Sequence, residues 1–199
     1  MLNHALGLLF DAKKEWRAIR DDEVSIVGCY LQYVLILALI PPFAGYFGTT
    51  QIGWQIGLSA PIKLTSTSAL PIAVLYYGAI LVAVFVVGKA IHWMANTYGA
   101  NPSLARCVRL AAFTATPLLL VGVMQLYPVL WLNFLVGLVA LAYTVYLLYS
   151  GVPIMMEISE ERGFLFSSAV VTFGLVAFVA MLAITVLLWG MGFAPEYTY

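Results

Sequence analysis

Charged side chains are scarce in this sequence, making up 9% of its 199 residues, against about 25% in an average soluble domain. Hydrophobic residues make up 63%. A soluble domain of this size has too small a core to hide that much apolar surface from water. Most of the chain must therefore lie in lipid. Nine basic and nine acidic residues cancel, so the net charge gives no indication of a nucleic-acid partner.

Residues that carry catalytic and metal chemistry are also few. The only histidines, His4 and His92, and the only cysteines, Cys29 and Cys107, do not stand at the spacings of metal ligands. No HExxH, GxSxG or Gly-rich phosphate motif occurs, and all three aspartates precede residue 23. We therefore expect a protein that is not an enzyme, without a cofactor or a bound metal.

Acidic residues are absent from every long apolar run. Five runs reach the roughly 20 residues that a membrane span requires: 24–47, 68–93, 105–126, 129–149 and 168–190. A helix satisfies its own backbone groups in lipid, and coupled pumps usually bury carboxylates that these runs lack. The sequence predicts an all-α integral membrane protein of five transmembrane helices, with residues 1–199 forming a single domain.

Proline interrupts two of these runs. Pro41 and Pro42 lie late in the first run and predict a kink or an early stop. Pro117 follows Thr114 and Thr116 in the third run, where a threonine hydroxyl or a neighbouring helix can satisfy the freed carbonyl. These five residues are candidates either for packing kinks or for the lining of a cavity.

The N-terminal segment, residues 1–23, is too short in its apolar part to span and dense in charge thereafter. Asp11 can cap a short helix. Its apolar side would hold Leu6, Leu9, Phe10, Trp16 and Ile19, and its polar side Lys13, Lys14, Arg17 and Arg20. We expect an interfacial helix along the membrane surface, with a solvated tail as the alternative.

The basic residues predict the orientation. With the N-terminus in the cytoplasm, eight of the nine lie in inner segments and only Lys63 lies outside. The C-terminus is then external. The tryptophans at 16, 54, 93, 131 and 189 all fall at or beyond the end of a predicted span, where amphipathic rings prefer to lie.

Four basic residues flank one cytoplasmic turn between the second and third runs: Lys89, His92, Arg106 and Arg109. Basic pockets between spans bind anionic lipid headgroups, so these residues form a candidate headgroup site. The alternative is snorkelling that only fixes the topology.

Two connections are predicted as loops. Residues 150–164 form a short acidic loop, in which Glu157, Glu160 and Glu161 either are solvated or face Lys13, Lys14 or Arg17. Residues 48–67 form an external loop. Re-entry into the membrane stays open for this loop, because Ile52, Trp54, Ile56 and Leu58 alternate with other residues.

Four stretches carry a family resemblance: LFDAKKEW near the start, TTQIGW after the first run, RLAAFTATPLLLVG in the third, and YTVYLLYSGVPIMMEISEERGFLFSS across the fourth connection. With them the chain resembles bacterial members of the Yip1 family over nearly its whole length. The resemblance implies five spans in the bacterial inner (plasma) membrane, a cytoplasmic N-terminus and no catalytic residue. Eukaryotic members bind Rab-type GTPases through long N-termini. This chain has only about 23 residues before its first span and lacks their DLYGP motif, so we do not expect that activity.

Two functions follow as expectations. The first is a non-enzymatic protein that organises the membrane by binding lipid, with anionic lipid expected, or a membrane protein partner, including a second copy of the chain. The second is a passive transporter or channel for a small or lipid-like solute, with a hydrated cavity lined by Gln32, Thr114, Thr116 or Asn133.

Overall fold

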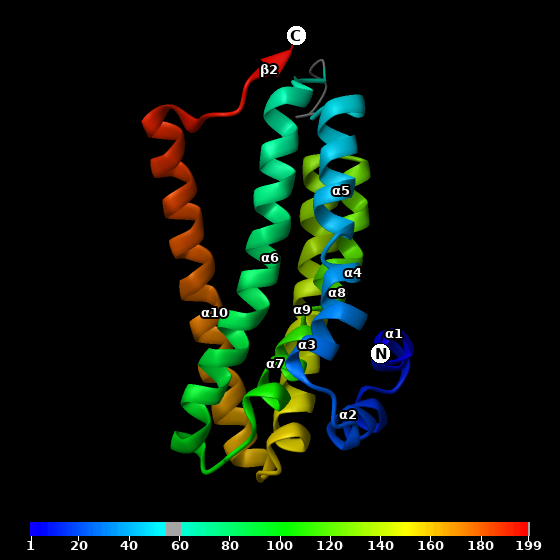
Figure 1. The fold of residues 1–199 in the computed structure, drawn as a ribbon, viewed down its shortest axis with the longest axis vertical. Helices are drawn as coiled ribbons and strands as arrows, with labels where there is room; N and C mark the ends of the chain where they lie inside the picture. Colours follow the sequence, from blue (N-terminus) through cyan, green and yellow to red (C-terminus); the bar gives the residue numbers. More distant parts are fainter. Residues whose placement is uncertain (55–60, 199) are drawn as a thin grey trace.

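The computed structural model describes residues 1–54 and 61–198, and it confirms an all-α membrane protein (Figure 1). Within these residues five helices are long and apolar enough to cross a membrane. They cover Ile26–Ile52, Ser66–Tyr98, Leu104–Leu126, Leu130–Met156 and Glu160–Met191. Each exceeds the roughly 20 residues that a hydrocarbon core of about 30 Å requires.

The first span is a broken helix that continues past its prolines. It consists of α3 (Ile26–Cys29), a π-helical turn (Tyr30–Val34), α4 (Leu35–Leu37), α5 (Ile40–Phe47) and a second π-helical turn (Gly48–Ile52). Pro41 and Pro42 lie in the first turn of α5, where a missing amide donor leaves no hydrogen bond unmade. The prolines therefore produce a kink after Ala38, and the early stop is wrong.

The third span bends at its own proline. Helix α7 (Leu104–Thr114) ends just before α8 (Thr116–Val121), and a 3₁₀ turn (Gly122–Leu126) completes the span. Pro117 cannot donate to the carbonyl of Phe113, and the Thr116 hydroxyl donates to that carbonyl instead, at 2.6 Å. This confirms that a threonine compensates for the proline.

The remaining spans are long helices with short connections. They are α6 (Ser66–Ala95) with a 3₁₀ turn (Asn96–Tyr98), α9 (Leu130–Met156), and α10 (Glu160–Leu188) with a π-helical turn (Trp189–Phe193). The acidic loop predicted over 150–164 is wrong in extent, because only residues 157–159 separate α9 from α10. Pro153 stays inside α9 and packs on Gly163 of α10. This contact joins the end of α9 to the start of α10.

Short backbone pairings close the opposite end of the bundle. Trp54 and Ile62 form an antiparallel bridge, and β1 (Lys63–Leu64) pairs antiparallel with β2 (Tyr197–Thr198). The C-terminal strand is thereby attached to the start of α6 (Figure 1). Ile56 and Leu58, on which the re-entry question rests, lie outside the described residues.

Two short helices precede the first span: α1 (Leu2–Phe10) and α2 (Ala12–Asp21). Both lie against the side of the bundle near the end that holds most of the charged residues (Figure 1). The side chain of Asp11 accepts a hydrogen bond from the Lys14 amide, which confirms the cap at the start of α2. The segment is helical and docked, so the solvated-tail alternative is wrong.

Candidate membrane-surface site

The N-terminal helices dock on the bundle through Trp16. This side chain is fully buried, and a Cβ added to Gly151 of α9 would lie only 2.6 Å from its ring. Glycine is therefore required where the indole crosses α9. Trp16 was expected among the interfacial tryptophans, but its ring packs inside the protein instead of facing outward. The tryptophans at 54, 93, 131 and 189 are exposed at helix ends, as expected.

The bundle also donates hydrogen bonds to the C-terminal carbonyls of both short helices. The Tyr143 hydroxyl donates to the Leu8 carbonyl at 2.9 Å, in the last turn of α1. The Arg109 guanidinium donates to the Ile19 carbonyl at 3.0 Å, in the last turn of α2. Carbonyls in a last turn have no partner within their helix, and a cation there also complements the helix dipole. Two spans thus cap α1 and α2.

His4 closes the segment on itself. Its Nδ1 contacts the Glu15 carboxylate of α2, and its Nε2 lies 3.3 Å from the Asp22 carboxylate that follows α2. The imidazole also meets the Phe113 ring of α7 edge-on, at 5.9 Å between centroids. These contacts join α1, the end of α2 and the third span at one point.

The four residues of the candidate headgroup site have different environments. Arg109 is only 4% exposed, and its Nε has no hydrogen-bond partner within the described part of the chain. Arg106 is half-buried and lies 3.5 Å from both the Met155 carbonyl and the Glu157 carboxylate. Lys89 and His92 are exposed at the end of α6. Only these last two present a free charged or polar group to a headgroup.

The acidic residues at this end also have different environments, one paired with arginine and two exposed. Glu157 faces Arg106 and lies 3.9 Å from Arg20, rather than facing Lys13, Lys14 or Arg17. Glu160 and Glu161 are exposed at the start of α10, where negative charge suits the helix dipole. Arg20 also contacts Asp21 at 2.9 Å, and this hydrogen bond raises the pKa of its guanidinium.

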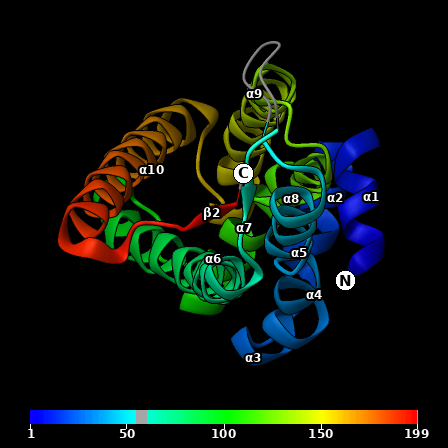
Figure 2. The ribbon, with the colours of Figure 1, turned by 90° about the horizontal axis from the view of Figure 1, so that it is seen from above.

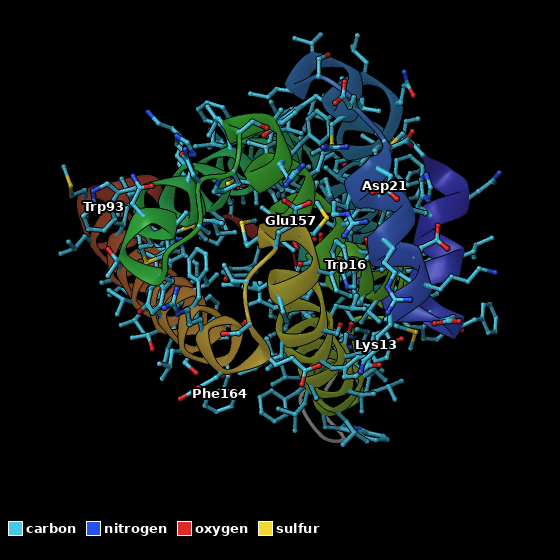
Figure 3. All side chains as sticks on the ribbon, turned by 90° about the horizontal axis from the view of Figure 1, so that it is seen from below. Lys13, Trp16, Asp21, Trp93, Glu157 and Phe164 are labelled. Atoms are coloured by element: carbon cyan, nitrogen blue, oxygen red, sulfur yellow. The ribbon has the colours of Figure 1, made fainter. Side chains whose placement is uncertain are left out.

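The outward face of α1 and α2 is amphipathic. Its apolar part is exposed: Phe10 is 89% exposed and Leu6 is 59% exposed. Its cations, Lys13, Lys14 and Arg17, are exposed as well. Figure 3 shows Trp16 and Glu157 toward the middle of this end of the molecule and Lys13 nearer its edge. The segment therefore holds the bundle with one face and presents cations and an aromatic ring with the other.

The candidate kink and cavity residues are mostly packed. Thr116 is fully buried and hydrogen-bonded to Tyr33 of the first span. Thr114 is buried, and its hydroxyl has no partner within residues 1–54 and 61–198. A Cβ at Gly122 would lie 2.5 Å from Pro41, so the proline of the first span packs on a glycine of the third. Gln32 is exposed, and Asn133 lines a cavity at the opposite end.

Three of these residues were not predicted as part of a site. His4, Tyr143 and Gly151 act through partners at least 11 positions away in the chain, so no periodic pattern marks them. A tyrosine in an apolar run was the one available signal, since a buried phenol needs a partner.

Comparison with known proteins supports a single family. The chain matches the Yip1 domain across residues 6–181. It is 43% identical over 192 residues to "Inner membrane protein YohC" of Escherichia coli strain K12, covering 96% of this chain and 98% of that protein. The protein of the same name from Escherichia coli O6:H1 has the same identity and coverage. No solved structure matches. Neither the family nor these relatives carry an enzymatic name.

Five apolar helices agree with the location that the relatives' name states. The match extends over most of the chain, from the N-terminal helices into α10. The chain therefore belongs to the Yip1 family and is a multi-pass protein of the inner membrane.

Proposed function

We propose that this protein is a non-enzymatic organiser of the inner membrane, which binds anionic lipid through its docked N-terminal helices. The observation that carries this proposal is the division of faces on α1 and α2. Trp16 is fully buried against α9, whereas Phe10 is 89% exposed beside the exposed Lys13 and Lys14. A soluble surface gains nothing from an exposed phenylalanine at this position, but a membrane interface does.

The chemistry of this face fits an anionic headgroup layer. Each Lys or Arg near such a surface contributes about 1 kcal/mol of attraction, and apolar side chains add by inserting between headgroups. Lys13, Lys14 and Arg17 supply the charge, and Leu6 and Phe10 supply the insertion. The face therefore favours phosphatidylglycerol or cardiolipin over zwitterionic lipid.

The basic residues of the turn between α6 and α7 have two roles in this proposal. Lys89 adds a separate exposed cation at the same end of the bundle, and His92 adds an exposed polar group. Arg109 and Arg106 instead support the docked segment, through the Ile19 carbonyl and through Glu157. Loss of Arg109 would thus weaken lipid binding indirectly, by releasing α2.

Packing in the middle of the bundle supports this role over passive transport. The kinked parts of the first and third spans pack directly on each other. Pro41 packs on Gly122, and the Tyr33 hydroxyl is hydrogen-bonded to Thr116. A passage for solute would need polar side chains facing a hydrated space, and these threonines face protein. Partner proteins, including a second copy, remain part of the proposal, with the exposed sides of α6 and α10 available to them.

Lipid retention in native mass spectrometry tests the proposal. Protein released from nanodiscs of phosphatidylglycerol and phosphatidylcholine is compared with a K13Q/K14Q/R17Q variant and with K63Q, which removes a single cation at the opposite end, as the control. We expect preferential phosphatidylglycerol retention that falls about fivefold for each charge removed. K63Q should leave it unchanged. Equal loss in K63Q, or no loss in the triple variant, would contradict the proposal.

A further inference from the structure

A cavity of about 170 Å³ lies at the end of the bundle opposite the N-terminal helices. Its walls come from the end of the first span, from the bridge that follows it, and from the turn between the third and fourth spans. The lining residues are Gly45, Thr49, Trp54, Gln125, Pro128, Leu130 and Asn133. None of them is charged, so any selectivity of the cavity depends on hydrogen bonds and on the aromatic ring.

Both N–H groups of the Asn133 side-chain amide are hydrogen-bonded within the protein. Its Nδ2 donates to the Tyr127 carbonyl at 2.6 Å and to the Val129 carbonyl at 3.1 Å. Both partners can only accept, which fixes the orientation of the amide. The remaining hydrogen-bonding capacity of Asn133 is the acceptor Oδ1.

Thr49 and Gln125 also have acceptor oxygens at the cavity. The Thr49 hydroxyl donates to the Gly45 carbonyl at 2.7 Å and keeps its lone pairs. The Gln125 Nε2 donates to the Tyr76 hydroxyl at 3.1 Å, and the Gln125 Oε1 faces the backbone of Gly45. Three segments therefore bring side-chain acceptors, from Thr49, Gln125 and Asn133, to one cavity.

The surroundings add an aromatic ring and one cation. Trp54 lines the cavity, and an indole attracts a cation over its face. Gly53, the residue before it, lies against the Lys63 side chain, since a Cβ added to Gly53 would lie 2.9 Å from the Lys63 Cγ. Lys63 is the only Lys or Arg between residues 21 and 88. Lys63 is therefore the cation that would meet a phosphate attached to an ammonium group in the cavity.

We propose that this cavity binds a primary ammonium group joined to a phosphate, which is the headgroup of phosphatidylethanolamine. Its three N–H donors match the acceptors of Thr49, Gln125 and Asn133. The trimethylammonium of phosphatidylcholine has no donor and is too bulky for the same contacts. The same chemistry occurs in the free headgroup, glycerophosphoethanolamine.

Native mass spectrometry of the full chain, released from nanodiscs that contain equal phosphatidylethanolamine and phosphatidylcholine, tests this site. A T49V/Q125L variant removes two acceptors. T185V is the matched control, because the Thr185 hydroxyl makes the same bond one turn back on α10, away from the cavity. We expect wild-type protein to retain phosphatidylethanolamine preferentially, the double variant to lose that preference about tenfold, and T185V to keep it.

Glycerophosphoethanolamine separates the two sources of the ligand. Retention of the lipid that excess soluble headgroup does not displace identifies the lipid as the ligand. Binding of the soluble headgroup that the double variant abolishes, without lipid retention, identifies the free compound. Equal retention of both lipids by wild-type protein with no binding of the soluble headgroup would overturn the proposal, as would a double variant that binds like T185V.

Discussion

The third and fifth spans of this protein are both long apolar helices, yet their surroundings differ sharply. In the most apolar 18-residue window of each, 67% of the residues are buried in the third span and 6% in the fifth. The mean hydropathy runs the other way, 1.8 against 2.7. A helix surrounded by protein can hold Arg109 and Thr116, whereas a helix surrounded by lipid must be apolar on every side.

The fifth span also changes along its length. Its buried residues, Gly163, Phe166, Ser167 and Val170, all lie in its first third, where Phe166 stacks on Tyr98. Beyond them α10 leans away from α6 and α9, and only β2 crosses back (Figures 1 and 2). Contacts with protein therefore surround the first third of α10, and the rest of the helix is left to contact lipid.

The largest expected effect is at the docking point of α2. Replacing Trp16 by Ala should lower the free energy of unfolding by about 3–5 kcal/mol, because it empties a fully buried site. Trp189→Ala, at an exposed position on the fifth span, should cost far less. Thermal unfolding in detergent measures both. Trp16→Phe is the conservative test and should cost much less than Trp16→Ala, because it keeps an aromatic ring and the Trp16 Nε1 makes no hydrogen bond within the described residues.

Removing the buried guanidinium should have the next largest effect. Arg109→Met keeps most of the side-chain volume but loses a hydrogen bond from a charged donor, which costs about 1.5–3 kcal/mol. Limited proteolysis should then cut the chain between α2 and α3 faster. Arg162→Met, at an exposed position, serves as the control. Equal proteolysis of the two variants would mean that Arg109 does not hold α2.

Adding a methyl group distinguishes a packed helix face from a lipid-facing one. Gly88→Ala should destabilise the protein by about 1–3 kcal/mol, because its Cβ would lie 2.7 Å from Val108 of α7. Gly174→Ala on α10 meets nothing within 4 Å and should be neutral or stabilising. Similar losses in chemical unfolding for both variants would remove the contrast between the spans.

The smallest expected effect comes from one hydroxyl. Tyr143→Phe should cost about 0.5–1.5 kcal/mol and raise amide exchange in α1, because the Leu8 carbonyl loses its donor. Tyr146→Phe is the neighbouring control, since Tyr146 is half exposed. Exchange in α1 that responds equally to both substitutions would contradict the capping role.

Local rules predicted the spans and their bends. A long run without charge is stable in lipid as a helix. The Thr116 hydroxyl supplies the hydrogen bond to the Phe113 carbonyl that Pro117 cannot donate. The docking of the N-terminal segment was not predictable in this way. It depends on Trp16 meeting Gly151, which are 135 positions apart in the chain. The burial of Arg109, in contrast to the exposed Lys89 and His92, was not predictable for the same reason. Arg109 donates to the Ile19 carbonyl of α2, so its environment depends on that docking.

The account depends most on the two faces of α1 and α2, which site-directed spin labels can measure directly. In a protein with Cys29→Ala and Cys107→Ala, both buried and free in the native chain, one label replaces Phe10 and another replaces Lys13. In nanodiscs with phosphatidylglycerol we predict that the label at 10 is accessible to oxygen in the lipid phase and that the label at 13 lies at the headgroup level. Water accessibility at both positions, unchanged by anionic lipid, would contradict the account.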